Sequence, residues 1–289
     1  MNTTRHTVAL CGATGFIGSH LRDRFNAADY HVIPLDRTLF TDAAADRLAA
    51  LLAGCDTVIN VAGATIDHRW GEAYKRRLFE SRIGTTRRLV AAMERSDSVR
   101  CWICASAVGY YPSEGCFDDT ADAAPGGDFL AGLCRQWEAE AHKAPARIRT
   151  TVTRFGVVLD GYGGAFGRLS LPAKLGVAVV PGNGSQPFTW IDIEDLCRAM
   201  TLLIESPELA GTFNFVAPQH LSMEEAVSLV RRHYKAWFQL HVPAPLLRLW
   251  RGEAADLLLK GQCVRPLRLL DAGFEFHTPE LQLFLQRLS

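Results

Sequence analysis

The fold is decided near the N-terminus by residues 7–18, which read Thr7-Val8-Ala9-Leu10-Cys11-Gly12-Ala13-Thr14-Gly15-Phe16-Ile17-Gly18. The first five residues form a continuous apolar run, as expected for a parallel β-strand that is buried on both faces. A helical pattern follows from about Phe16 to Asn26. The glycines between strand and helix permit a tight turn, whose backbone N–H groups can approach a pyrophosphate at the helix N-terminus. This strand–turn–helix order predicts a dinucleotide-binding unit.

The rest of the first half repeats the alternation of short apolar runs with longer amphipathic ones. We expect further strands over residues 31–35, 57–62, 100–105 and 149–155, and helices over 42–53, 71–94 and 128–142. Pro34 argues against a central position for the second strand, because proline cannot donate to the ladder of hydrogen bonds. The alternation predicts an α/β fold with a Rossmann-type, doubly wound parallel sheet.

The pattern changes after about residue 156, where turn-forming sequences become frequent. Residues 222–225 read as a capping box, and Thr278-Pro279-Glu280 places a proline at a first helical position. Residues 243–260 predict one long helix. We therefore expect residues 1–155 to form an NAD(P)-binding Rossmann domain, rejoined by about 192–216. Residues 156–289 are expected to form mainly a smaller, substrate-binding C-terminal α+β domain.

Composition narrows the choice of partners. The 289 residues include 31 Lys and Arg and 31 Asp and Glu, so the formal charge is zero, which argues against nucleic acid or membrane binding. No apolar run approaches the roughly 18 residues of a membrane span, and no signal peptide is evident. The eight scattered cysteines indicate reduced thiols in the cytoplasm, and the spacing of the nine histidines implies no metal. A small-molecule substrate is expected, with the chain a monomer or homodimer.

The cofactor-binding candidates lie at two places after the first strand. The turn contributes Gly12, Thr14, Gly15, Phe16, Ile17 and Gly18, and the end of the third strand contributes Ala62, Gly63 and Ala64. At the end of the second strand, Asp36 and Arg37 stand side by side. An acid there binds ribose hydroxyls, as in NAD enzymes, whereas an arginine pairs with the 2′-phosphate of NADP. These two residues leave NAD and NADP both open.

Several longer stretches are more specific than the fold. They are residues 58–66 with Arg69-Trp70, residues 81–86, residues 128–131 with Trp137-Glu138, residues 154–164 and 190–196, and a tail that includes Val242-Pro243-Ala244-Pro245 and residues 272–276. Together they resemble the atypical extended short-chain dehydrogenase/reductases of the YfcH-type epimerase family, including their C-terminal domain of unknown function. The resemblance implies a cleft between two domains and a preference for NADP.

The resemblance also shows which catalytic groups are missing. Active members of the superfamily use a serine, a tyrosine, and a lysine four residues after the tyrosine. Ser106 matches the serine, but Leu130 stands at the tyrosine position and Cys134 at the lysine position. A cysteine for that lysine, and an arginine matching Arg82, are what this branch is known for. Arg82 could lower the pKa of the Cys134 thiol, or it could bind an anion; alternatively, Cys134 is a small buried side chain.

Two functions remain open from the sequence. The first is an NAD(P)-dependent oxidoreductase or epimerase on an unknown small polar substrate, with Ser106 holding the reacting oxygen. Tyr111 or Tyr110 would then donate the proton and Arg82 would bind an anionic group. The second is a non-catalytic protein that binds NADP(H) and reports its redox state, which the loss of the tyrosine–lysine pair favours.

Overall fold

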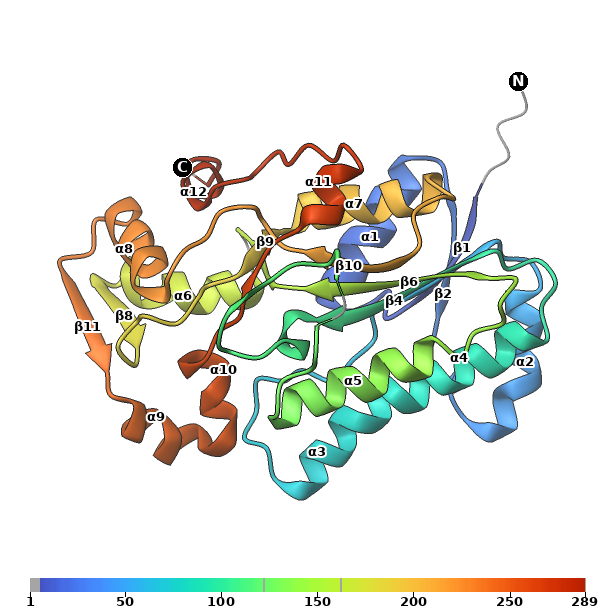
Figure 1. The fold of residues 1–289 in the computed structure, drawn as a ribbon, viewed down its shortest axis with the longest axis horizontal. Helices are drawn as coiled ribbons and strands as arrows, with labels where there is room; N and C mark the ends of the chain where they lie inside the picture. Colours follow the sequence, from blue (N-terminus) through green and yellow to red (C-terminus); the bar gives the residue numbers. More distant parts are fainter. Residues whose placement is uncertain (1–5, 122, 162, 289) are drawn as a thin grey trace.

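The computed structural model describes residues 6–121, 123–161 and 163–288, and its centre is a six-stranded parallel sheet (Figure 1). The strand order is β10-β6-β4-β3-β1-β2. The strands are β1 (Thr7–Cys11), β2 (His31–Leu35), β3 (Thr57–Asn60), β4 (Cys101–Ala107), β6 (Arg149–Phe155) and β10 (Gly211–Phe215). The edge position of β2 confirms the prediction from Pro34. Because β1 lies between β2 and β3, the topology reverses at β1, and a crevice is expected beyond the ends of β1 and β3.

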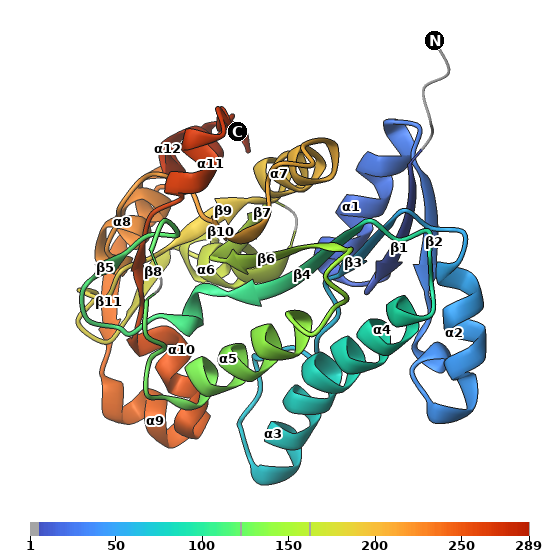
Figure 2. The same ribbon diagram turned by 45° about the vertical axis from the view of Figure 1, so that its right-hand side comes forward.

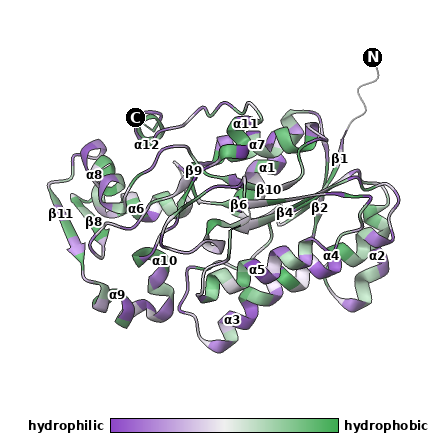
Figure 3. Cartoon of the chain, in the orientation of Figure 1, coloured by the Kyte–Doolittle hydropathy of each residue, from purple (hydrophilic) through white to green (hydrophobic). Residues whose placement is uncertain are grey.

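Helices cover both faces of this sheet, which confirms the doubly wound prediction (Figures 1 and 2). One face carries α1 (Phe16–Ala27) and α7 (Ile193–Glu205), with α11 (Leu267–Asp271) beside them. The other carries α2 (Ala45–Leu52), preceded by a 3₁₀ turn over Asp42–Ala44, together with α4 (Thr85–Glu94) and α5 (Phe129–Ala141). Hydrophobic and hydrophilic residues alternate along α4 and α5 in Figure 3, so each of these helices buries one side on the sheet.

Two predicted long helices are interrupted. Residues 71–94 form α3 (Glu72–Phe79), a π-helical turn over Glu80–Gly84, and α4. Residues 243–260 form α9 (Ala244–Arg251), a 3₁₀ turn over Gly252–Ala255, and α10 (Asp256–Leu259). The second break lies at Gly252, which has a φ of +60°, a conformation that glycine adopts readily.

The C-terminal side builds a second hydrophobic core beyond the main sheet. Here β8 (Val177–Pro181) pairs with β11 (Phe238–Val242), and β7 (Val157–Asp160) with β9 (Trp190–Asp192). The helices are α6 (Gly164–Lys174), α8 (Met223–His233) and α12 (Leu281–Gln286), and the fully buried Phe166, Trp190 and Phe284 centre the core. The capping box at Ser222 is confirmed. The prediction for Pro279 is wrong, because α12 begins two residues later, at Leu281.

The expectation that all cysteines are reduced is wrong for two of them. Cys116 and Cys263 form a disulfide between β5 (Cys116–Phe117) and β12 (Cys263–Val264), two short strands that pair in parallel. They are 147 residues apart in sequence, so no local pattern could reveal the pairing. Six cysteines in the described part of the chain are free and buried. Across the described ranges, no helix has the length and apolar character needed to cross a bilayer.

Candidate functional site

The turn after β1 packs closely against the end of β3. Gly12 has a φ of +88°, and a Cβ there would lie 2.9 Å from the backbone nitrogen of Ala62. A Cβ on Gly18 would overlap the Gly12 carbonyl oxygen, which accepts a hydrogen bond from the Gly15 N–H at 2.9 Å. Only glycine fits at positions 12 and 18 without moving backbone atoms. The two predicted cofactor segments are therefore neighbours in space.

The start of α1 is open to an anion. Gly15 is its N-cap and supplies no side-chain hydrogen bond, and the first turn carries no acidic residue. The first N–H groups of a helix have no acceptor within the helix, and they carry its partial positive charge. Thr14 and Gly15 are exposed at the tip of the turn, while Phe16 and Ile17 are half-buried. The backbone here fits the pyrophosphate of a dinucleotide.

The backbone after β3 is held in place by polar side chains beneath it. Asn60 accepts a hydrogen bond from the Ala62 N–H at 3.0 Å and donates one to the Thr86 hydroxyl at 3.0 Å. The Ser81 hydroxyl accepts a hydrogen bond from the Ala64 N–H, also at 3.0 Å. Residues 62–64 therefore form a rigid edge beside the turn.

Arg82 lies in the π-helical turn, under this same edge. Its Nη2 donates to the Ala64 carbonyl oxygen at 3.0 Å, and its guanidinium lies 5.4 Å from the centre of the Trp137 ring. A Cβ on Gly63 would come within 3.0 Å of that guanidinium. Burial lowers the pKa of Arg82, and its side chain pairs with no carboxylate among the described residues. A half-buried cation without a counter-charge suits a site for an anionic group.

Ser106 lies at the end of β4 and belongs to a buried polar network. Its hydroxyl donates to Glu138 Oε1 at 2.6 Å. Arg154, opposite Ser106 in β6, holds both oxygens of the same carboxylate, with Nε 2.9 Å from Oε1 and Nη2 2.7 Å from Oε2. Burial alone would lower the pKa of Arg154, but the hydrogen bonds and charge of Glu138 outweigh burial and raise it. Because the Ser106 proton is directed to Glu138, the serine oxygen is left as an acceptor.

Cys134 is buried one helical turn before Glu138. Burial raises the pKa of its thiol to about 12, with the Glu138 charge acting in the same direction. Ser106 and Arg82 act in the opposite direction but are outweighed. Burial and the Glu138 charge therefore oppose activation of this thiol by Arg82 and favour the alternative that Cys134 is a small buried side chain.

The two tyrosines after β4 lie in different environments. Tyr111 is buried, and its hydroxyl donates to Asn214 Oδ1 at 3.0 Å and lies 3.2 Å from the Asp118 carbonyl oxygen. This burial and hydrogen bonding favour a packing role for Tyr111 over the role of proton donor. Tyr110 is half-buried, with the Arg154 guanidinium 3.6 Å from its ring centre, and its hydroxyl has no hydrogen-bond partner among the residues the structure describes.

Asp36 and Arg37, at the end of β2, make different interactions. The Asp36 carboxylate accepts the Thr38 N–H at 2.8 Å and caps the 3₁₀ turn Arg37–Leu39, and this hydrogen bond lowers the pKa of Asp36. The exposed Arg37 guanidinium makes no hydrogen bond or ion pair within the described ranges. The arginine is thus the side chain that is free for a phosphate.

Glu138 and Arg154 were not identified as functional candidates from the sequence. Charged side chains are rarely buried, but neither burial could be read from the local pattern: Glu138 lies in an amphipathic helix, and residues 149–155 of β6 include three threonines and two arginines. A separate pocket of about 720 Å³ lies on the C-terminal side, lined by Gly182, Asn183, Gln186, His241, Pro243, Ala244, Arg248 and Leu259. None of the predicted site residues lines it.

Comparison with known proteins agrees with this architecture. Residues 8–215 match the NAD dependent epimerase/dehydratase family, and residues 242–288 match DUF1731, a domain of unknown function. The human epimerase family protein SDR39U1 is 33% identical over 295 residues, covering 97% of this chain and 99% of the relative. An epimerase family protein of Staphylococcus haemolyticus is 31% identical, covering 96% and 97%.

Solved structures give the same result. The crystal structure of human SDR39U1 (isoform 2) with NADPH superposes with a TM-score of 0.89 at 32% identity, covering 98% of each chain. A UDP-glucuronic acid 4-epimerase from Bacillus cereus, in complex with UDP-glucuronic acid and NAD, has a TM-score of 0.78 at 17% identity and shares the fold. The resemblance found in the sequence is confirmed. The chain belongs to the NAD dependent epimerase/dehydratase family, among the epimerase family proteins that end in DUF1731.

Proposed function

We propose that this protein binds NADP(H) and acts as an oxidoreductase or epimerase on a small polar molecule. The observation that carries the proposal is the glycine turn of residues 12–18 packed against residues 62–64, with Ser106 at the end of the next strand, β4. The similarity to human SDR39U1, whose structure contains NADPH, supports the choice of dinucleotide. We also propose a cytoplasmic location, because six cysteines of the described chain are free and a reducing compartment would open the Cys116–Cys263 disulfide.

Different residues would bind different parts of the dinucleotide. The backbone N–H groups of Phe16 to Gly18 would bind the pyrophosphate, and residues 62–64 would line the edge of the site. Arg37 would pair with the 2′-phosphate, because Asp36 is occupied in capping its own turn. When bound, the dinucleotide supplies hydride chemistry at its nicotinamide ring.

The reacting group would meet Ser106 and Arg82. Since the Ser106 proton is directed to Glu138, its oxygen can accept a hydrogen bond from a carbinol, which supports binding of the alcohol form of a substrate. Arg82 would bind an anionic group of the substrate or of the dinucleotide. Tyr110 replaces Tyr111 as the candidate for moving the proton, because the Tyr111 hydroxyl is bonded to Asn214 while the Tyr110 hydroxyl has no partner in the described part of the chain. Cys134 takes no part, since its thiol stays protonated.

The cofactor choice is tested by titrating NADPH and NADH against the wild-type protein and the Arg37→Gln variant. Loss of a charge-assisted bond to phosphate costs about 1.5–3 kcal/mol, so NADPH should bind about 10–100-fold more weakly to the variant. NADH affinity should stay within about threefold, because NADH lacks the 2′-phosphate. Arg232→Gln, which removes an exposed arginine from α8, is the matched control and should change neither affinity. Equal affinities for NADPH in the wild type and Arg37→Gln would refute this assignment.

The same buried groups also favour a second function, a redox-state sensor without turnover. Leu130 stands where the proton-donating tyrosine is expected, and Ser106 is tied to Glu138. Both functions require NADPH binding, but only the enzyme oxidises it. Slow NADPH oxidation with one member of a carbonyl panel, lost in Ser106→Ala and reduced in Tyr110→Phe, would support the enzyme. Binding without oxidation, together with partner capture that depends on NADPH over NADP, would support the sensor.

A further inference from the structure

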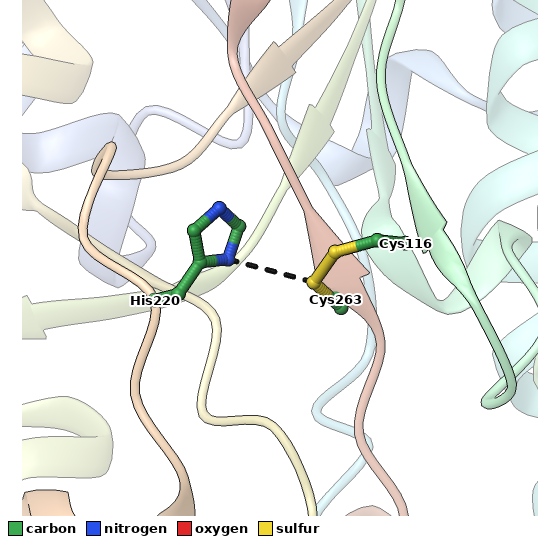
Figure 4. Close-up of side chains that lie close together, drawn as sticks. All are labelled: Cys116, His220 and Cys263. Atoms are coloured by element: carbon green, nitrogen blue, oxygen red, sulfur yellow. Dashed lines mark hydrogen bonds between the residues drawn. A yellow bond between two sulfur atoms is a disulfide. The ribbon is translucent and has the colours of Figure 1, made fainter.

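Two cysteines and a histidine from three distant segments converge at the pair of short strands β5 and β12 (Figure 4). Cys116 lies on β5, Cys263 lies on β12, and His220 belongs to the loop between β10 and α8. The Cα atoms of the two cysteines are 4.6 Å apart, and His220 Nδ1 is 3.5 Å from Cys263 Sγ. The three potential ligand atoms all lie within 4.8 Å of one another.

This donor set suits a soft divalent ion. Two thiolates and one imidazole are the ligands of known Cys₂His zinc sites, which keep a fourth position open. With Zn–S bonds of about 2.3 Å and Zn–N bonds of about 2.0–2.1 Å, a tetrahedron has an S···N edge of about 3.6 Å and an S···S edge of about 3.8 Å. The 3.5 Å from His220 to Cys263 already matches the S···N edge. After reduction, rotation about the Cα–Cβ bonds of the two cysteines can supply the S···S edge.

The backbone under these ligands is fixed before any ion arrives. Cys116 and Cys263 are directly paired in register, and the Arg265 N–H donates to the Phe117 carbonyl oxygen at 2.8 Å. Beside His220, the Leu221 carbonyl oxygen accepts the Phe188 N–H at 2.7 Å. Cys116 and His220 are exposed, so an ion can reach the cluster from solvent.

We propose that the dithiol form of this protein binds one Zn²⁺ through Cys116, Cys263 and His220, with the fourth position left to water or an external ligand. A thiol or phosphine reductant gives two electrons to the disulfide, and the two sulfurs take up two protons as the S–S bond breaks. Zinc binding then releases those two protons, because both sulfurs coordinate as thiolates. The disulfide and the zinc site exclude one another, and each ties β5 to the C-terminal region that contains β12.

Cobalt provides the direct test, because thiolate ligands give Co²⁺ an intense near-ultraviolet charge-transfer band. The full-length protein is reduced with tris(2-carboxyethyl)phosphine, desalted without oxygen, and titrated first with Co²⁺ and then with Zn²⁺. We expect one equivalent of Co²⁺ with a thiolate band and tetrahedral visible bands, both abolished by one equivalent of Zn²⁺. Changes outside the first shell of a metal site cost about 10–100-fold in affinity, so Cys263→Ser and His220→Ala should each bind at least about 100-fold more weakly.

Two controls use the same chain. The air-oxidised wild type carries the closed disulfide and should show no thiolate band, and His31→Ala, which removes an exposed histidine from β2, should bind like the wild type. Absence of a thiolate band in the reduced wild type, or unchanged affinity in Cys263→Ser and His220→Ala, would overturn the proposal. Circular dichroism verifies that each variant is folded. No readout involves a nucleotide, so the outcome is independent of the proposed enzyme function.

Discussion

Replacing Glu138 with glutamine tests the buried network around Ser106. The side chains of Glu138 and Arg154 are only 8% and 9% exposed, and two hydrogen bonds of 2.9 and 2.7 Å join them. Glutamine keeps the shape and one acceptor oxygen but removes the negative charge. The Arg154 guanidinium is then left with the rings of Tyr110 and Tyr111, whose centres lie 3.6 and 4.7 Å away. The variant therefore leaves a buried cation without its counter-charge.

The expected loss of stability follows from this burial. Removing one partner of a buried ion pair costs about 3–5 kcal/mol, and the retained acceptor places Glu138→Gln near the lower end, at about 3 kcal/mol. In a protein of this size, each kcal/mol shifts Tm by about 2–4 °C, so Tm should fall by about 6–12 °C. Urea and thermal unfolding followed by circular dichroism measure both quantities.

An exposed ion pair provides the matched control. Arg95 and Asp46 are 2.9 Å apart, but their side chains are 53% and 92% exposed, so Asp46→Asn should cost less than about 1 kcal/mol. Adding Arg154→Met to Glu138→Gln removes the stranded charge, so the double variant should be about 1–3 kcal/mol more stable than the sum of the single effects. A cost for Glu138→Gln no larger than that of Asp46→Asn, with additive effects in the double variant, would refute the reasoning.

Two further predictions concern titratable groups. With its pKa raised to about 12, Cys134 should be ionised in only about one molecule in 10⁴ at pH 8. Mass spectrometry should therefore find native Cys134 unmodified by iodoacetamide while reduced Cys116 reacts; rapid modification of both would contradict the burial. Ser222→Ala should cost about 1 kcal/mol at pH 7, because the capping box is lost. Hydrogen bonds from Ser222 lower the pKa of Glu225 below its ordinary value of 4.5, so this contribution is present above pH 4.5 and fades as the pH falls further; an equal cost at pH 3 and pH 7 would contradict it.

The sequence was sufficient for features that depend on local pattern. The buried run of β1 and the glycine turn follow from apolar continuity and from the freedom of glycine to adopt positive φ. Pro34 predicted the edge strand because proline has no backbone N–H to donate to a neighbouring strand, and the capping box at Ser222 predicted the start of α8. In each case the deciding interaction lies within a few residues along the chain.

Other features depended on residues that are far apart in sequence. The disulfide of Cys116 requires Cys263, which is 147 residues away, so it is not visible in a local pattern. The π-helical turn that carries Arg82 interrupts a sequence that reads as one amphipathic helix. The roles of the site residues also depend on residues that are far apart in sequence. Whether Cys134 is reactive depends on how deeply α5 buries it, and whether Ser106 donates or accepts depends on the carboxylate that Arg154 holds beside it.

The amino-acid sequence by itself determined the alternation of strands and helices in the N-terminal half and the nucleotide turn, because these depend on short-range periodicity and on backbone geometry. Its resemblance to known proteins indicated the family. Only the tertiary structure decided which polar groups lose their water and which partners they find. Burial and pairing set the charge of a side chain and the direction of its proton, and both depend on what the rest of the chain places around it.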